Sequence, residues 1–152
     1  HIDQSLFART ILDEKNGPPP EVNLFNEKNN GESILNLIDK GYVVSAHDIS
    51  LGGLLVAVSK MCIKGNKGIK INKSKNLINE IEYFFAEDQG RYLIEVNKED
   101  LKEVTKILNK NSVHHEELGI ITQNDMIINE KTKVTIDELK SYYTNWLSKY
   151  MS

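Results

Sequence analysis

The segment that most restricts the fold is residues 42–57, which has the pattern of a strand, a glycine-containing turn and a helix. The strand part is rich in β-branched and aromatic residues, and an apolar series at helical spacing follows the turn: Leu54, Leu55, Val58, Met61 and Cys62. Gly52 and Gly53 permit a sharp turn and a close approach of another backbone or of a ligand. A turn that opens a helix leaves backbone N–H groups unpaired at the positive end of the helix dipole, so this segment suits a phosphate or another anion.

The polar residues of this segment have two interpretations. In the functional one, His47, Asp48, Ser50, Gly52 and Gly53 line a ligand pocket. In the structural one, His47 only ends the strand, Asp48 and Ser50 accept hydrogen bonds from N–H groups of the turn, and the glycines allow tight packing. The glycine spacing matches neither of the usual phosphate-loop templates, so spacing alone favours the structural interpretation.

A second polar turn, at residues 87–91, leads into a strand that alternation predicts at residues 92–96. Glu87, Gln89 and Arg91 bring a carboxylate, an amide and a guanidinium together, and Asp88 adds a second carboxylate. Because Arg offers planar, bidentate donors to phosphate or carboxylate, this turn can grip a polar ligand. The alternative is a salt-bridged turn before an exposed strand, which is an ordinary surface feature.

Length and composition predict one compact domain. The 152 residues, 39% of them hydrophobic, are enough to bury a core. With 19 basic and 22 acidic residues the net charge is −3, and no long basic tract indicates a nucleic-acid partner. Cys62 is the only cysteine, which excludes an intrachain disulfide and favours a cytoplasmic location. No apolar run approaches the roughly 20 residues of a membrane span, and no signal-peptide pattern is visible, so we expect no membrane association.

Apolar spacing and capping residues predict the remaining elements. Helices are expected over residues 3–12, from Ser33 to Gly41, around Leu77, Ile78 and Ile81, from Asn97 through Leu108, and from Thr135, which pairs with Glu138 in a capping box. Strands are expected at residues 69–71 and 113–122, with a hairpin at 126–128 and 133–136. The adjacent His114 and His115 point to opposite faces of a strand and do not predict a metal site.

Strands and helices interleave without the regular spacing of a doubly wound fold, so the predicted class is α+β, a mixed sheet with helices packed against it. We expect residues 1–30 to form a linker and an N-terminal helix, and residues 31–152 to form the domain. The last helix has an aromatic face, including Trp146, that must be covered by the sheet or by a neighbour. The absence of an initiator Met predicts that the chain is a piece of a longer polypeptide.

Two patches together carry a family resemblance. Ala46 to Leu54 (AHDISLGGL) and Phe85 to Ile94 (FAEDQGRYLI) resemble the C-terminal domain of the aminoimidazole ribonucleotide synthetase-like superfamily. Within it, the chain most resembles the large synthetase subunit of the phosphoribosylformylglycinamidine synthases. That narrower resemblance rests on Gln4-Ser5-Leu6, on Gly17 before three prolines, and on the ending from Leu139 through Trp146-Leu147 to Tyr150-Met151.

The resemblance implies a part in an ATP-dependent ligase of purine biosynthesis. The whole enzyme of that family uses ATP, Mg²⁺ and ammonia from glutamine to convert formylglycinamide ribonucleotide to formylglycinamidine ribonucleotide. Its implied partners are the rest of the synthetase polypeptide, a glutaminase subunit and a small bridging subunit. This chain contains neither a glutaminase triad nor the family's ATP-binding half-domain, so we expect it to be inactive alone and to bind no cofactor tightly.

Some residues depart from the family's catalytic pattern. The family's first-half turn carries Glu-Ser-Gln-Glu-Arg, whereas residues 87–91 here are EDQGR, and Leu51 stands where related domains often have Asp. These departures resemble the degenerate second half, which the family associates with a structural or auxiliary nucleotide site. We therefore expect no catalytic or metal-binding residue, and a ligand or interdomain pocket lined by His47, Asp48, Ser50, Gly52, Gly53, Glu87, Gln89 and Arg91.

Two alternatives stay open. One is the same domain type from another enzyme of the superfamily, such as aminoimidazole ribonucleotide synthetase or a selenophosphate or thiamine-phosphate kinase relative. The other is a stand-alone α+β interaction or regulatory module. The proline triplet and the aromatic last helix argue against the first, and the sequence upstream of this chain would decide both.

Overall fold

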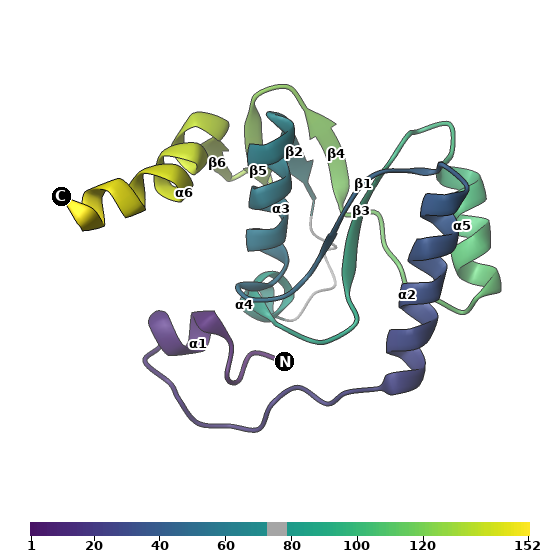
Figure 1. Cartoon of the computed structure of the whole chain (residues 1–152), viewed down its shortest axis with the longest axis horizontal. Helices are drawn as coiled ribbons and strands as arrows, with labels where there is room; N and C mark the ends of the chain where they lie inside the picture. The colour runs from purple at the N-terminus through teal and green to yellow at the C-terminus, as the bar shows by residue number, and fades with distance from the viewer. Residues whose placement is uncertain (73–78) are drawn as a thin grey trace. The chain divides into compact units, whose positions relative to one another are not determined.

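The computed structural model describes residues 1–72 and 79–152, and its helices and strands confirm the α+β class (Figure 1). The chain divides into two compact units, which are described separately. The first contains His1–Ala57 and Asn79–Glu116, and the second contains Val58–Ile78 and Glu117–Ser152. The expected division into a linker over residues 1–30 and a domain over 31–152 stays a prediction.

The first unit is built on a two-stranded antiparallel ribbon of β1 (Val43–Asp48) and β3 (Tyr92–Val96), with Ala46 opposite Ile94 and Asp48 opposite Tyr92. Its helices are α1 (Leu6–Thr10), α2 (Leu24–Asp39), α4 (Glu80–Phe85) and α5 (Leu101–Lys110). Helices α2 and α5 lie side by side against the ribbon in Figure 1.

The core of the first unit forms where these two helices meet the ribbon. Leu37 of α2 is fully buried with Val104 and Leu108 of α5, and Ile94 and Val96 of β3 pack against them. Val104 and Leu108 are spaced by four residues, so they lie on one face of α5, as the predicted apolar stripe requires. This packing holds β3, and the polar turn before it, in a defined place.

The second unit contains a mixed four-stranded sheet in the order β4-β2-β5-β6. The strands are β2 (Gly68–Ile71), β4 (Gly119–Thr122), β5 (Asp125–Ile128) and β6 (Thr132–Thr135). Strand β2 pairs antiparallel with β4 and parallel with β5, and β5 forms the predicted hairpin with β6. Helix α3 (Gly53–Gly65) begins in the first unit and continues into the second, and α6 (Ile136–Met151) follows β6.

Several element boundaries differ from the predictions. Helix α2 begins at Leu24 with Asn23 as its N-cap, whereas Ser33, the predicted cap, lies inside the helix. The Ser33 hydroxyl accepts a hydrogen bond from Asn111 Nδ2 at 3.0 Å. The N-cap of α5 is Asp100, not Asn97. Of the strand expected at residues 113–122, only Gly119–Thr122 forms.

Other predictions are confirmed. The capping box of Thr135 and Glu138 opens α6, and β2 forms over the alternating isoleucines. The helix expected around Leu77, Ile78 and Ile81 begins at Glu80, and its first two named residues lie outside the described part of the chain. Within the described residues, none of the helices is both long and apolar enough to cross a bilayer.

Candidate functional site

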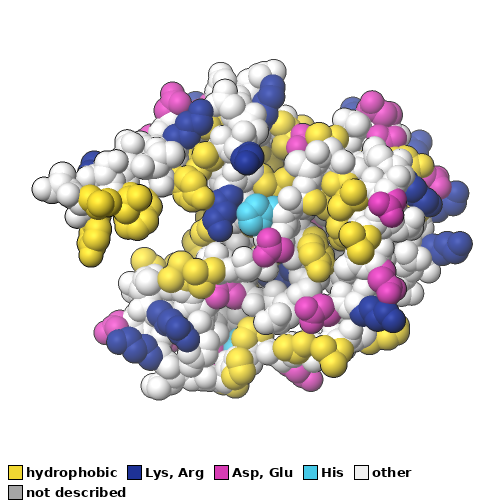
Figure 2. Space-filling view, viewed as in Figure 1, with side chains coloured by type: hydrophobic (Ala, Val, Ile, Leu, Met, Phe, Trp, Pro, Cys, Tyr) yellow, Lys and Arg dark blue, Asp and Glu magenta, His cyan; other side chains and the backbone are white. Residues whose placement is uncertain are grey.

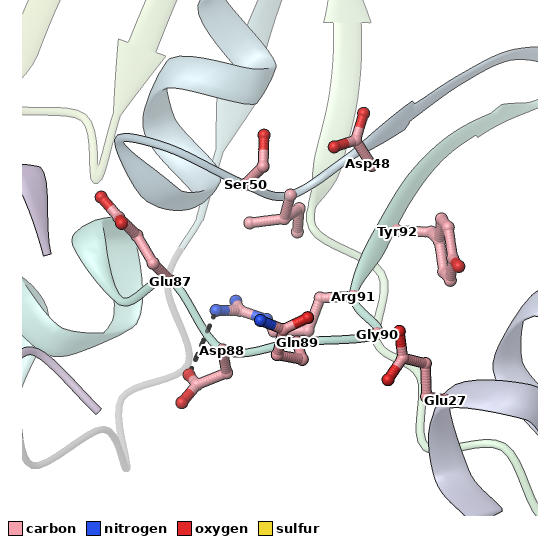
Figure 3. Close-up of a pocket in the computed structure, with 10 residues that line it drawn as sticks. Glu27, Asp48, Ser50, Glu87, Asp88, Gln89, Gly90, Arg91 and Tyr92 are labelled. Carbon is pink, nitrogen blue, oxygen red and sulfur yellow. Dashed lines mark ion pairs between the residues drawn. The ribbon is translucent and has the colours of Figure 1, made fainter. Parts of the chain in front are cut away.

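A pocket of about 210 Å³ opens in the first unit, where the two polar turns of the sequence meet the start of α2 (Figure 3). Its walls come from the end of β1 and the turn after it, from the segment between α4 and β3, and from the first turn of α2. The lining residues are Glu27, Asp48, Ile49, Ser50, Glu87, Asp88, Gln89, Gly90, Arg91 and Tyr92.

The antiparallel ribbon explains why two turns far apart in the sequence share this pocket. Asp48 ends β1 directly opposite Tyr92, which begins β3. The Ile49 N–H then donates to the Arg91 carbonyl at 2.9 Å, which extends the strand pairing by one more bond. The segment after β1 and the segment before β3 therefore run side by side.

The glycines of the first turn serve a close approach of the chain's own backbone. Gly52 and Gly53 have φ angles of +88° and +71°, which residues with side chains rarely adopt. A Cβ atom on Gly53 would lie 2.7 Å from the Cα and carbonyl carbon of Phe85. The close approach predicted for this turn is therefore made by the end of α4, and Gly53 is needed for packing.

Glu87 accepts a hydrogen bond from one backbone N–H of the turn that the sequence offered to an anion, and another from the start of α1. Its Oε1 accepts a hydrogen bond from the Gly52 N–H at 2.8 Å and a second from the Leu6 N–H, also at 2.8 Å. The Gly53 N–H donates to the Ser50 backbone carbonyl at 2.9 Å, so this N–H is not capped by the side chain of Asp48 or Ser50. The turn is thus closed by an acidic side chain of the same domain.

Arg91 is held by the polar turn from which it comes. Its Nη1 donates to the Ala86 carbonyl at 3.3 Å and lies 3.6 Å from Asp88 Oδ2 (Figure 3). The opposite wall is fixed by Asn30 of α2, whose Nδ2 donates to the Gly90 carbonyl at 3.0 Å. The guanidinium is therefore partly neutralised before any ligand enters.

The structure brings some of the predicted site residues together and leaves others apart. Asp48, Ser50, Glu87, Gln89 and Arg91 line the pocket. The pocket lining does not include His47, Gly52 or Gly53. His47 instead lies beside its neighbour on β1, with Nδ1 3.5 Å from Asp48 Oδ1. Ligand binding by any of these residues stays a prediction.

Five residues that line the pocket were absent from the predicted set: Glu27, Ile49, Asp88, Gly90 and Tyr92. Glu27 lies in the first turn of α2, in a stretch for which no helix was predicted. Tyr92 was predicted only as a strand residue, and the register that sets it opposite Asp48 is a long-range feature. A correct start for α2 would have revealed Glu27, because it follows the N-cap Asn23 by four residues.

The pocket is acidic. Glu27, Asp48, Glu87 and Asp88 contribute carboxylates, and Arg91 is the one basic side chain among the lining residues. Like charges repel an incoming anion, and the repulsion grows as water is excluded. The arrangement can accept hydrogen bonds from a neutral or cationic group, but it is poorly suited to a phosphate.

The groups with a raised pKa, Cys62 and Tyr83, do not line this pocket. Burial raises the pKa of the Cys62 thiol to about 11. Burial also raises the pKa of Tyr83 above its ordinary value, and the hydrogen bond that its hydroxyl donates to Glu116 at 2.7 Å adds to the effect. Among the described residues, no group of three or more His, Cys, Asp and Glu side chains is placed to hold a metal ion.

Comparison with known proteins assigns the chain to a family. The family described as AIR synthase related protein, C-terminal domain, matches residues 4–129. The chain belongs to this family. The resemblance carried by residues 46–54 and 85–94 is thereby confirmed.

Two of its curated relatives are phosphoribosylformylglycinamidine synthase subunits. The chain is 64% identical over 151 residues to the phosphoribosylformylglycinamidine synthase subunit PurL of Pelagibacter ubique, covering 99% of the chain and 21% of that protein. It is 37% identical over 151 residues to PurL of Bartonella henselae, covering 99% of the chain and 20% of that protein. The chain thus spans about a fifth of the length of these curated relatives.

Solved structures with the same fold come from Thermotoga maritima. PurL complexed with FGAR superposes with a TM-score of 0.67 at 21% identity, over 78% of this chain and 21% of that one. The structure named PurLQS superposes with a TM-score of 0.67 at 21% identity, over 87% of this chain and 24% of that one. At this level of identity the likeness supports the fold alone.

Proposed function

We propose that the chain is the non-catalytic C-terminal domain of a phosphoribosylformylglycinamidine synthase, an ATP-dependent ligase of purine biosynthesis. The observation that carries this proposal is the 64% identity to the Pelagibacter ubique PurL subunit along 99% of the chain. The reaction joins ammonia from glutamine to formylglycinamide ribonucleotide at the expense of ATP. A cytoplasmic location fits this role.

The geometry of the second turn supports a non-catalytic role. In the family's catalytic pattern a Glu stands where this chain has Gly90. Gly90 has a φ angle of +66°, and a Cβ atom on it would lie 3.2 Å from Glu27 Cα. A glutamate at this position would be strained and pressed against α2. The pocket thus has little room for a glutamate side chain at this position.

The charge of the pocket supports the same conclusion. The substrate and ATP are both anionic, whereas Arg91 is paired with Asp88 and the other charged lining residues are acidic. We therefore assign ATP, Mg²⁺ and the ribonucleotide to other domains of the enzyme, and expect none of them to bind this domain tightly.

Exposed apolar side chains on α6 support a place within a larger protein. Tyr142, Trp146 and Tyr150 follow one another at four-residue spacing and are 80%, 60% and 82% exposed. Hydrophobic side chains gather along α6 in Figure 2. An apolar helix face left in water is unfavourable, so we propose that the rest of the synthetase polypeptide covers it. In the assembled enzyme, a glutaminase subunit and a small bridging subunit complete the complex.

A chimeric enzyme tests this proposal. In the Pelagibacter ubique PurL subunit, the segment that matches this chain is replaced by the chain itself. The chimera should form formylglycinamidine ribonucleotide from the ribonucleotide, ATP and ammonia at a rate close to that of the parent, and the isolated chain should form none. Product formation by the isolated chain, or an inactive but folded chimera, would contradict the proposal.

Pocket variants of the same chimera test the non-catalytic role. Arg91→Ala and Gln89→Ala should leave kcat within about twofold of the unmodified chimera, because neither side chain touches reacting atoms in this proposal. A fall of about a hundredfold in kcat, with an unchanged melting temperature, would place these residues in the chemistry.

A further inference from the structure

Glu87 joins three segments of the first unit through one carboxylate oxygen. Its Oε1 accepts hydrogen bonds from the Leu6 N–H and from the Gly52 N–H, each at 2.8 Å. Leu6 begins α1, Gly52 directly precedes α3, and Glu87 itself lies just after α4. In Figure 3 the carboxylate of Glu87 points away from Arg91 and Gln89.

Both N–H groups need an acceptor that their own helices do not provide. Ser5, the N-cap of α1, uses its Oγ to accept from the Ala8 N–H at 3.1 Å, which leaves the Leu6 N–H for another partner. Gly52 is buried, so without Glu87 its N–H would have no hydrogen-bond acceptor to compensate for the loss of water. A charged acceptor makes these bonds about twice as strong as a neutral one would.

Apolar side chains also pack where α1, the Gly52 turn and the end of α4 meet. The rings of Phe7 and Phe85 stack with their centroids 4.6 Å apart, so α1 and the end of α4 are in contact beside Glu87. Gly53 also lies against the Phe85 backbone. The two hydrogen bonds therefore hold together segments that also share a packed surface.

We propose that Glu87 is a positioning residue: it ties the start of α1 and the Gly52 turn to the segment that carries Asp88 to Arg91. Its carboxylate is committed to these backbone groups and does not serve a ligand. A ligand in the pocket would instead meet Asp48, Ser50, Gln89 and Arg91. This role concerns the folding of the domain and holds whether or not the domain serves the ligase proposed above.

Three variants of the chain test this role: Glu87→Ala, Glu87→Gln and, as a matched control, Asp48→Ala. The control removes a carboxylate from the same pocket, and hence the same charge, without removing a backbone contact of Leu6 or Gly52. Glu87→Ala should lower the melting temperature by roughly 5 °C and Asp48→Ala by less than about 2 °C. Glu87→Gln keeps an acceptor oxygen and should recover at least half of the loss.

Amide NMR shifts and anion rescue separate positioning from a general loss of stability. In Glu87→Ala and Glu87→Gln, the amide protons of Leu6 and Gly52 should both move upfield, whereas Asp48→Ala should leave the Leu6 amide in place. Sodium acetate should raise the melting temperature of Glu87→Ala above that in sodium chloride of equal ionic strength, and should not do so for Asp48→Ala.

Unchanged amide shifts of Leu6 and Gly52 in the Glu87 variants would overturn the proposal. Equal melting temperatures for Glu87→Ala and Asp48→Ala would also overturn it. Should Glu87→Ala fail to fold, the amide shifts of Glu87→Gln decide the matter.

Discussion

The turn at residues 85–91 and helix α6 present opposite kinds of side chain at the surface. In the turn, charged groups find partners inside the same unit: Glu87 binds the Leu6 and Gly52 N–H groups, and Arg91 lies beside Asp88. On α6, large apolar groups find none that bury them, and Trp146 stays 60% exposed. The charged side chains of the turn thus bind groups of their own unit, whereas the apolar side chains of α6 remain exposed and available for contact with another segment.

The two regions also differ in how widely their sequences are matched among related proteins. The family match ends at residue 129, before α6 begins at Ile136, and it includes both polar turns. The match to the Pelagibacter ubique subunit covers 99% of the chain. The two turns therefore lie inside the part that the family model describes, whereas α6 lies outside it and is matched by the Pelagibacter ubique subunit.

The largest expected effect is at Gly53, where the first turn approaches α4. Gly53→Ala places a Cβ atom 2.7 Å from the Phe85 backbone at a φ angle of +71°. We expect it to lower the free energy of unfolding by about 3 kcal/mol, measured by urea denaturation. Gly65→Ala is the control at the other end of α3, since nothing lies within 4 Å of its added Cβ. Equal effects of the two substitutions would mean that the close approach is not needed.

A smaller loss of stability, about 2 kcal/mol, is expected for Trp146→Ala, and only when the rest of the PurL polypeptide is present to cover α6. In the isolated chain, Trp146→Ala should change the free energy of unfolding by less than about 0.5 kcal/mol, because the side chain is 60% exposed. In the chimera with the rest of the PurL polypeptide, it should lower the melting temperature by several degrees. Ser148→Ala, on the opposite side of α6, is the control. A loss confined to the isolated chain would mean that α6 has no partner in the larger protein.

The sequence predicted the turns better than their partners. Gly52 and Gly53 indicated a sharp turn and a close approach, and both are observed. Which group makes the approach depends on Phe85, more than thirty residues away, and spacing within one segment cannot reveal that. The same holds for Glu87, which was predicted to line a ligand or interdomain pocket: it does line the pocket, but spacing could not reveal that its carboxylate also binds two backbone N–H groups.

Local signals also failed where a residue had a long-range partner. Ser33 had the type and position of an N-cap, but its hydroxyl accepts from Asn111 and the helix begins at Leu24. The capping box of Thr135 and Glu138 was predictable because both of its hydrogen bonds are made within four residues. The local cap of α6 was therefore predicted, whereas Ser33 gave a false cap signal and the equally local cap of α2 at Asn23 was missed.

A further effect, about 1 kcal/mol, is expected at the cap of α6. Thr135 Oγ1 accepts from the Glu138 N–H at 3.2 Å, and Glu138 Oε2 accepts from the Thr135 N–H at 2.9 Å. Thr135→Ala should shorten α6 and lower its helicity, as measured by circular dichroism and urea denaturation. Thr144→Ala removes the same side chain from the exposed middle of α6 and should have little effect. Equal losses would show that the box does not hold the helix.

The smallest expected effect is the pH dependence of the same cap. The hydrogen bond from the Thr135 backbone, followed by that from its hydroxyl, holds the pKa of Glu138 below its ordinary value of 4.5. The resulting stability is present above the unfolded-state pKa and is lost as the pH falls through the folded-state pKa. The difference in melting temperature between the wild type and Glu138→Gln should therefore shrink between pH 6 and about pH 3.

The source of this pH dependence is tested in the Thr135→Ala background. There the pH-dependent difference should be smaller, because the substitution removes the hydroxyl and keeps the backbone N–H that donates to Glu138. If the difference in melting temperature does not depend on pH, the ionisation of Glu138 does not contribute to the stability of α6. A difference of the same size in both backgrounds would assign it to the backbone hydrogen bond alone, so the helix would depend on the carboxylate and not on the full box.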